Sequence, residues 1–202
     1  MSVFLVGAAA AAGLALLHNG RKGGGDSSRH EGGSVDVEPH RDTSRYGEAA
    51  VLLEALDTPY YWGGKGVAHW DDILRNLADE DAPPWGVDCS FFGCLAWEKL
   101  GIRPLDKAHP RLNTTGLANI SNPVEVGKQR PGDLSYYPGH VMVVLSYPGA
   151  DGHSEVIGAS GGGRSDFGTN PNARVKIQPR GNYRKDFVCY MRLKPELGGR
   201  WG

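Results

Sequence analysis

The chain has 202 residues, a formal net charge of −1 at pH 7 and 30 glycines. This length allows one domain with a substantial core plus extensions, and the nearly balanced charge argues against a general nucleic-acid binder, so no nucleic-acid partner is expected. The three cysteines, at positions 89, 94 and 189, lack the spacing of zinc ligands, and neither a metal nor another cofactor is expected.

The first 19 residues are almost wholly apolar, and no Lys or Arg precedes this segment, whereas Arg21 and Lys22 follow it. Its uncharged core, Ser2 to Leu17, is short against the roughly 20 residues of a membrane-spanning helix, and its length also suits a signal peptide. We expect an apolar helix at residues 1–19 outside the domain, with the roles of membrane anchor, export signal and assembly element left open. Residues 20–45 are polar and glycine-rich and predict a flexible linker.

The globular domain is expected over residues 46–195, followed by a short tail at 196–202, and helical patterns fill its first half. Strong helix formers, apolar residues at helical spacing and stop signals such as Asp57-Thr58-Pro59 define three helices. The expected helices are Glu48 to Leu56, Trp70 to Leu77 and Cys89 to Leu100.

The second half of the domain consists of short runs with strand character, divided by Gly, Pro and Asn. The expected strands are Asp133 to Tyr137, His140 to Tyr147, Ser154 to Ala159, Arg174 to Gln178 and Phe187 to Leu193. Helices followed by strands predict an α+β fold with an antiparallel sheet.

Cys89 stands at the expected start of the third helix, directly after Asp88, a residue type that suits an N-cap. The unpaired N–H groups in the first turn of a helix favour a thiolate over a thiol. Further along the chain, His140 begins an expected strand. A cysteine at a helix start and a histidine on a strand are the parts of a thiol nucleophile and its base, and the alternative is a buried, capped cysteine without chemistry.

Five motifs follow one another in an informative order. They are Tyr60-Tyr61-Trp62-Gly63-Gly64, Asp88-Cys89-Ser90, Arg130-Pro131-Gly132-Asp133-Leu134, Gly139-His140-Val141-Met142-Val143 and Val156-Ile157-Gly158-Ala159-Ser160. Together they resemble the NlpC-type cell-wall peptidases, papain-like cysteine hydrolases of bacteria and their phages. The resemblance implies a papain-like NlpC-type fold, in which N-terminal helices, including the nucleophile helix, pack on an antiparallel sheet. It implies Cys89 as the nucleophile and His140 as the base that later protonates the leaving amine.

The resemblance also implies a third catalytic residue on the strand after the histidine, where a polar side chain orients the imidazole. Gly158 stands at that position and has no side chain for the role. Ser160 lies two residues further on the same strand face and is the candidate for this third residue. His153, Glu155 and a backbone carbonyl are the alternatives.

Three residues match substrate-binding positions of the family. Tyr60 corresponds to a tyrosine near the nucleophile, whose hydroxyl serves the substrate backbone or the oxyanion, together with the Cys89 backbone N–H. Asp88 and Ser90 correspond to residues that hold the free amine of a stem peptide, because a carboxylate suits an ammonium group.

Other positions carry expectations about the shape of the cleft. Trp62 is expected to pack beneath the sheet. Phe91 replaces the usual small residue and is expected to crowd the helix packing or narrow the cleft. The long segment from Lys65 to Val87 is expected to form a lid or wall, and Gly161 to Gly163 a flexible rim.

The resemblance implies a peptidoglycan hydrolase that cleaves an amide of the cell-wall stem peptide through an acyl-enzyme. The expected partners are this peptide and, through residues 1–19, a membrane or a virion assembly. The expected location is the cell envelope, with the protein anchored or exported, or a phage virion. One alternative is a CHAP-type amidase or endopeptidase. Another is a non-catalytic wall-binding or virion structural protein that retains the fold, an alternative supported by Gly158 and Phe91.

Overall fold

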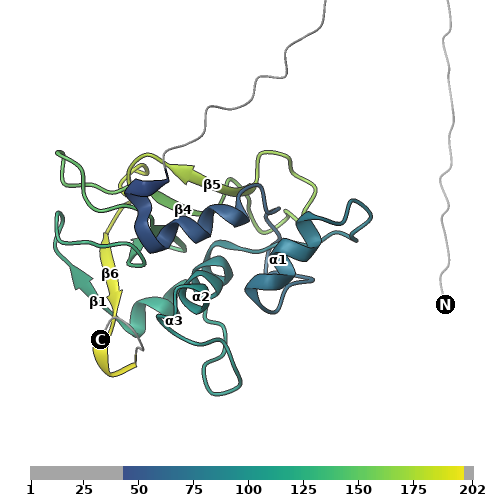
Figure 1. Cartoon of the computed structure of the whole chain (residues 1–202), viewed down its shortest axis with the longest axis horizontal. Coiled ribbons are helices and arrows are strands. Elements are labelled where there is room, and N and C mark those ends of the chain that lie inside the picture. Colours follow the sequence, from purple (N-terminus) through teal and green to yellow (C-terminus); the bar gives the residue numbers. More distant parts are fainter. Residues whose placement is uncertain (1–42, 198–202) are drawn as a thin grey trace, which may run out of the picture. The chain divides into compact units, whose positions relative to one another are not determined.

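The computed structural model describes residues 43–197. Helices come first along the chain and strands later, as Figure 1 shows, which confirms the expected α+β class. The elements are η1 (Ser44–Ala55), α1 (Trp70–Leu77), α2 (Cys89–Lys99), α3 (Thr114–Asn119), β1 (Ser121–Val124), β2 (Leu134–Tyr137), β3 (His140–Val144), β4 (Val156–Ser160), β5 (Arg174–Gln178), β6 (Cys189–Leu193) and η2 (Pro195–Leu197).

The strands form one six-stranded antiparallel sheet in the order β1-β6-β2-β3-β4-β5. Strands β2 and β3 make a hairpin in which Tyr137 pairs with His140, so only Pro138 and Gly139 form the turn. Gly139 has a φ of 72°, a conformation that glycine adopts without steric cost. This tight turn fixes the position of His140 at the start of β3.

Helix α2 packs against β3 and β4 and is buried along most of its length. Asp88 caps its start, since the Asp88 side chain accepts a hydrogen bond of 2.8 Å from the Phe91 backbone N–H. Near its other end, the buried Trp97 indole donates a 2.8 Å hydrogen bond to the Gly132 carbonyl. The helix is therefore held at both ends, and its first residue, Cys89, has a fixed place beside the sheet.

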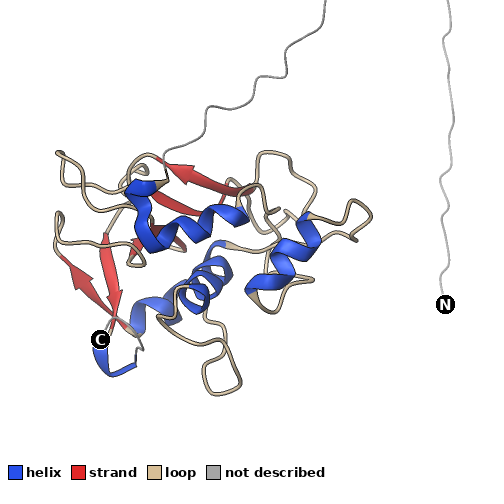
Figure 2. Ribbon diagram, viewed as in Figure 1, coloured by secondary structure: helices blue, strands red, loops and turns tan. Residues whose placement is uncertain are grey.

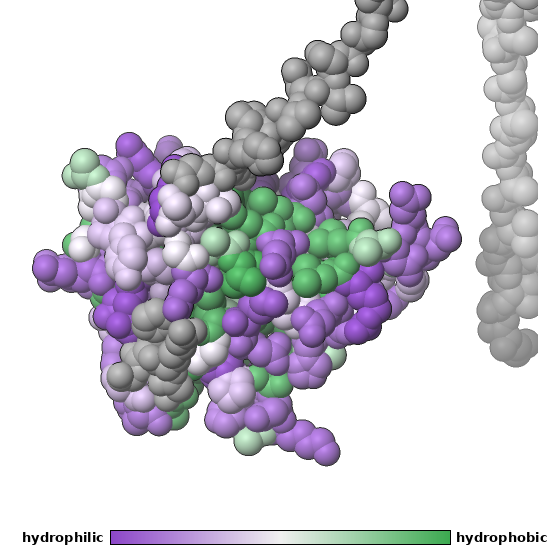
Figure 3. Space-filling model, viewed as in Figure 1, coloured by the Kyte–Doolittle hydropathy of each residue, from purple (hydrophilic) through white to green (hydrophobic). Residues whose placement is uncertain are grey.

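The sheet separates two apolar clusters. The larger cluster fills the space between the sheet and the helices and includes Val141 and Val143 of β3. The smaller cluster lies on the opposite face and includes Met142 and Val144, the alternate residues of the same strand. Figure 2 shows the helices crossing the centre of the view with strands at its left and top, and Figure 3 shows apolar residues at the centre of that face within a hydrophilic margin.

Several expected elements are confirmed with small shifts. Helix α1 and strand β5 have the expected bounds, and α2 ends one residue early, with Leu100 as its C-cap and Gly101 at a φ of 67°. The expected first helix is instead a 3₁₀ helix that begins at Ser44 and is kinked at Gly47. It ends at Ala55, whose carbonyl accepts hydrogen bonds from the backbone and hydroxyl of Thr58.

Three elements, α3, β1 and the short η2, were not expected from the sequence. The expected apolar helix at residues 1–19 and most of the linker at 20–45 lie outside the described residues. Between residues 43 and 197, no helix is long and apolar enough to cross a membrane.

Candidate active site

Cys89 and His140 reach one cleft from two different elements. Cys89 is the first residue of α2, and His140 is the first residue of β3. The cleft has a volume of about 380 Å³. Its lining residues are Tyr60, Trp62, Cys89, Gly139, His140, Ser160, Gly161, Gly162, Tyr183 and Arg184. The structure therefore brings together the two residues that the sequence predicts as nucleophile and base.

The Cys89 sulfur is surrounded by backbone groups. Its Sγ lies 4.0 Å from the Gly139 carbonyl oxygen, and backbone N–H groups of Val141, Ser90 and Cys89 act to lower the pKa of the thiol. Burial is the stronger effect, helped by the Asp88 carboxylate, and raises the pKa of Cys89 to about 11. The resting group at neutral pH is therefore a thiol, although it lies at a helix start.

His140 is also buried, with 8% of its surface exposed. Burial lowers its pKa to about 4, and the nearby Arg184 guanidinium adds to this effect, while Asp186 opposes it. The imidazole is neutral at pH 7 and able to accept a proton. Within residues 43–197, no hydrogen bond joins its ring to the Cys89 sulfur.

The ring of His140 does have one hydrogen-bond partner, which the sequence reasoning missed. Its Nε2 lies 3.0 Å from the hydroxyl of Tyr183, a residue of the segment between β5 and β6. The rings of Tyr183 and Tyr137 meet edge to face at a centroid distance of 5.5 Å. A lone tyrosine in an irregular segment gives no periodic signal, so only the folded chain reveals this contact.

Ser160 lines the cleft together with Tyr183, and its hydroxyl acts to lower the pKa of that tyrosine. The alternatives lie elsewhere. His153 has the Tyr190 hydroxyl on Nδ1 and the Asn182 amide on Nε2, and Glu155 pairs with Arg45. Of the side chains weighed for the third position, only Ser160 reaches the surroundings of His140.

Tyr60 also lines the cleft, as expected, and only 4% of its surface is exposed. Burial raises the pKa of its hydroxyl, and the charges of Cys89 and Asp88 add to the effect. Among residues 43–197, its hydroxyl has no hydrogen-bond partner, which leaves it available to a ligand. An added Cβ on Gly162 would come within 2.3 Å of the Tyr60 ring, so the expected rim loop packs directly on this tyrosine.

Asp88 and Ser90 lie beside the nucleophile but are absent from the cleft lining. One Asp88 oxygen, Oδ1, accepts both a 2.8 Å hydrogen bond from the Ser90 hydroxyl and the capping bond from Phe91. The structure thus gives both residues a part in starting α2. Their expected contact with a substrate amine stays a prediction.

The expectation that Trp62 packs beneath the sheet is wrong. The Trp62 side chain is 44% exposed and lines the cleft, and the Arg164 guanidinium lies 5.7 Å from its ring centroid. The two glycines that follow allow the chain to turn there, since Gly63 and Gly64 have φ values of 77° and 65°. An exposed aromatic ring at a cleft is a surface on which a ligand can stack.

Phe91 is buried and packs away from the cleft lining. Its ring lies 2.6 Å from the place a Cβ on Gly64 would take, and Arg111 covers it at 4.4 Å from the ring centroid. The segment from Lys65 to Val87 contributes no residue to the cleft lining. Its helix α1 packs on α2 instead, with the rings of Trp70 and Phe92 6.0 Å apart, so its expected role as a lid or wall has no support in this arrangement.

Both other cysteines contribute to packing. Cys94 is buried, with its sulfur 3.3 Å from the Leu112 backbone nitrogen, and Cys189 is partly buried against the larger cluster. No group of three or more potential metal-ligating side chains occurs in the part of the chain that the structure describes.

Comparison with known proteins gives similarities of structure. No family model and no curated protein matches the sequence. The P60 domain of an antigen from M. avium subspecies paratuberculosis is 19% identical with a TM-score of 0.45, covering 76% of this chain and 95% of that one. A protein described as similar to a lipoprotein of the NLP/P60 family, from Staphylococcus aureus, is 16% identical with a TM-score of 0.43, covering 78% of this chain.

This chain spans 44% of the staphylococcal protein's length. The first of these structures is described as a P60 domain and the second as a member of the NLP/P60 family. At these identities and TM-scores, the similarities assign no activity to the chain.

Proposed function

We propose that this protein is a cysteine hydrolase that cleaves an amide bond of the peptidoglycan stem peptide. The observation that carries the proposal is the meeting of Cys89 and His140 in one cleft. A helix start and a strand start converge there, and a thiol and a neutral imidazole are the two groups that nucleophilic amide cleavage requires. Tyr60 and Trp62 supply a hydroxyl and an aromatic surface beside them.

The reaction begins with transfer of the thiol proton to His140 as Cys89 Sγ attacks the carbonyl carbon of the scissile amide. The Cys89 backbone N–H and the Tyr60 hydroxyl donate to the oxygen that becomes negative. The imidazolium of His140 then gives its proton to the leaving amine, and a thioester remains. Water, deprotonated by His140, attacks the thioester, and the C–S bond breaks. The imidazolium returns its proton to Cys89 Sγ, which restores the thiol and the neutral ring as the new carboxylic acid leaves.

The resting protonation state determines when the first proton moves. Because burial holds Cys89 as a thiol and His140 as a neutral ring, a preformed ion pair of thiolate and imidazolium is not the resting state. Proton transfer therefore accompanies the attack, in the manner of general base catalysis by a serine hydrolase. For this transfer, the substrate complex has to bring Sγ and the ring within hydrogen-bonding distance, since apo sites are often looser than reacting ones.

The cell envelope or a phage virion is the proposed place of action, with residues 1–19 as the anchor, signal or assembly element. The motif resemblance is the support for both the substrate and the location. A CHAP-type amidase or endopeptidase would use the same pair of residues, and the Asp88-Cys89-Ser90 and Tyr60-to-Gly64 motifs favour the NlpC type.

The test is the digestion of purified cell walls by the full chain, followed by mass spectrometry of the released muropeptides. Wild-type protein is expected to create new amine and carboxylate ends within the stem peptide, and Cys89→Ala is expected to create none. Cys94→Ala is the matched control, because it removes a buried thiol from the same helix outside the cleft. Failure of the wild type to cleave walls of several types, or cleavage by Cys89→Ala, would contradict the proposal.

A second candidate function is a wall-binding or virion structural protein without catalysis. The elevated pKa of the Cys89 thiol favours it, because a helix start in a reactive cysteine enzyme commonly lowers this pKa. Co-sedimentation of Cys89→Ala with insoluble walls separates the two. Binding without any cleavage by the wild type supports the structural role.

A further inference from the structure

The contact between His140 and Tyr183 leaves the two ring nitrogens in different situations. Nε2 lies 3.0 Å from the Tyr183 hydroxyl, whereas Nδ1 has no hydrogen-bond partner among residues 43–197. A neutral imidazole carries its proton on one nitrogen and accepts on the other, and the partner of one nitrogen selects the tautomer. If Nε2–H donates to Tyr183, Nδ1 is the nitrogen left to accept the proton of Cys89.

Position 158, where the resemblance places the side chain that orients the imidazole, cannot supply such a partner in this fold. Gly158 lies on β4, and an added Cβ there would come within 2.9 Å of the Met142 sulfur. Strand β3 places Met142 on the same face as His140. Met142 therefore fills the space into which a side chain at position 158 would extend, and the ring needs a partner from another element.

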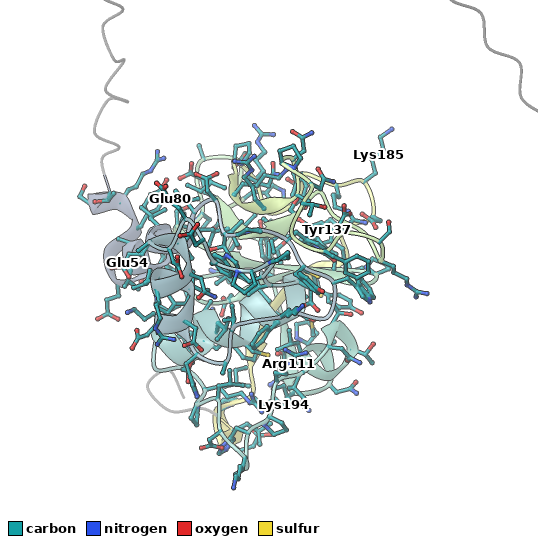
Figure 4. The ribbon with its side chains drawn as sticks, turned by 90° about the vertical axis from the view of Figure 1, so that its right-hand side faces the viewer. Glu54, Glu80, Arg111, Tyr137, Lys185 and Lys194 are labelled. Carbon is teal, nitrogen blue, oxygen red and sulfur yellow. The ribbon has the colours of Figure 1, made fainter. Side chains whose placement is uncertain are left out.

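Tyr183 is held firmly enough to be that partner. Its neighbour Asn182 donates to His153 Nε2 at 3.0 Å. On the other side, Arg184 makes two hydrogen bonds to Asp186, at 2.9 and 2.6 Å, and lies 5.2 Å from the Tyr137 ring centroid. In Figure 4, Tyr137 lies within the body of the fold while Lys185, two residues after Tyr183, points outward. The segment is anchored inward on both sides of the tyrosine.

We propose that Tyr183 is the positioning residue of His140, its hydroxyl oxygen accepting a hydrogen bond from Nε2–H. In this arrangement Nε2 carries the proton and Nδ1 presents its lone pair to the cleft. Ser160 lines the same cleft, and its hydroxyl acts to lower the pKa of Tyr183, as a donor to the Tyr183 oxygen does. Tyr183, from the segment before β6, thus has the orienting role that the resemblance assigns to a side chain on β4. Ser160 acts on the histidine through Tyr183.

This inference rests on the proposed function for its meaning, because a tautomer matters only if His140 accepts the thiol proton. Its consequences for the histidine ring are independent of any substrate. A phenol hydroxyl is a neutral acceptor, so it orients the ring without adding a negative charge beside the imidazolium.

The experiment is nitrogen NMR of the full chain labelled with ¹⁵N-histidine at pH 7, with the His140 signals assigned by their loss in His140→Gln. The wild type is expected to show a protonated Nε2, with an observable proton signal, and an unprotonated Nδ1. In Tyr183→Phe the aromatic contact with Tyr137 is kept and the acceptor is lost. The Nε2–H signal is then expected to disappear through exchange with water.

Tyr190→Phe is the matched control, because it removes another Tyr–His hydrogen bond of 3.0 Å, the one to His153 Nδ1. It is expected to change the His153 signals and leave those of His140 in place. With wall substrate, Tyr183→Phe is expected to lower kcat by roughly 10²- to 10⁴-fold, the range of general acid–base catalysis, with KM unchanged.

A wild-type His140 that is protonated at Nδ1, or an Nε2–H signal that survives Tyr183→Phe, overturns the inference. Neither result depends on cleavage of cell wall. If the NMR outcome is as expected and no wall is cleaved, the proposed function fails and the positioning of His140 by Tyr183 stands.

Discussion

The two faces of the sheet differ in chemistry, and the candidate site draws one residue from each. The helix-covered face is packed almost entirely by apolar side chains, with Cys89 at the start of α2. The opposite face combines Met142 and Val144 with tyrosines whose hydroxyls bond to histidines and backbone. His140 belongs to this second face by strand alternation.

This difference shows how the two halves of the site are fixed. The nucleophile is placed by dense packing, since α2 is buried and capped at its start. The base is placed by hydrogen bonds, since its ring is held by Tyr183 in an aromatic group. Mutations that remove buried side chains from the helix-covered face are thus expected to lower the free energy of unfolding. Mutations of polar groups on the other face are expected to change how this free energy depends on pH.

The largest effect is expected for the packed face. Trp97→Ala removes a fully buried indole from α2 together with its hydrogen bond to the Gly132 carbonyl. The free energy of unfolding is expected to fall by about 3–5 kcal/mol. Urea denaturation measures it, with Val188→Ala, whose wild-type side chain is 55% exposed, as a control expected to change it by less than about 0.5 kcal/mol. Equal effects of the two variants would show that the packing of Trp97 on the helix-covered face does not stabilise the fold.

The next largest effect is the pH dependence of stability that His140 gives to the polar face. The pKa of His140 is lowered from 6.5 to about 4 in the folded state, so the unfolded state binds the proton first as pH falls. Stability from this group is complete above pH 6.5 and is lost as pH falls toward 4, by about 3 kcal/mol in total. His140→Gln is expected to abolish this part of the acid sensitivity, as measured by urea unfolding at pH 7 and pH 4.5. An unchanged pH dependence in the variant would show that the ring titrates normally.

A somewhat smaller effect concerns the reactivity of Cys89. Its pKa is raised from 9.0 to about 11, so at pH 7.5 the thiolate is about 100-fold rarer than for an ordinary cysteine. In a variant with Cys94→Ala and Cys189→Ala, alkylation by iodoacetamide is expected to be slower than in the urea-unfolded chain by that factor. The rate should rise about tenfold per pH unit between pH 8 and 10. Equal rates in the folded and unfolded chains at pH 7.5 would show that the pKa of Cys89 is not raised, and a faster reaction of the folded chain would reveal a preformed ion pair.

The smallest effect is expected at the contact between β3 and β4. Gly158→Ala places a methyl group 2.9 Å from the Met142 sulfur, and a flexible thioether can move aside. We expect a loss of about 1 kcal/mol in the free energy of unfolding, read from thermal or urea melts. Gly158→Ala combined with Met142→Ala should recover part of the loss attributed to crowding. A further additive loss would mean that the two side chains do not meet.

The elements that the sequence predicts well are those with strong local signals. Helix α1 and the start of α2 follow from an apolar spacing and the Asp88 cap, and β5 follows from alternation. Helix α3 has only six residues, and β1 contains Pro123, so neither has the length or composition that local rules recognise. The helical signal at the start of the domain was correct, but the kink at Gly47 and the 3₁₀ winding were not predictable from it.

The same limit applies to the site. Cys89 and His140 are found from motifs, because each lies at the start of an element whose start is encoded locally. The contact of His140 with Tyr183 joins residues 43 positions apart through an irregular segment. The exposure of Trp62 depends on turns at Gly63 and Gly64 rather than on the hydrophobicity of indole. Such features depend on tertiary packing, which no local pattern contains.

The close approach of Gly162 to the Tyr60 ring has a consequence for how this sequence can vary. A Cβ at position 162 would overlap the tyrosine ring at 2.3 Å, so no side chain fits at 162 while an aromatic ring stays at 60. The two positions are therefore constrained as a pair, although they lie far apart in the chain. Natural relatives with a larger residue at 162 are expected to carry a smaller one at 60, and through it a cleft of different width.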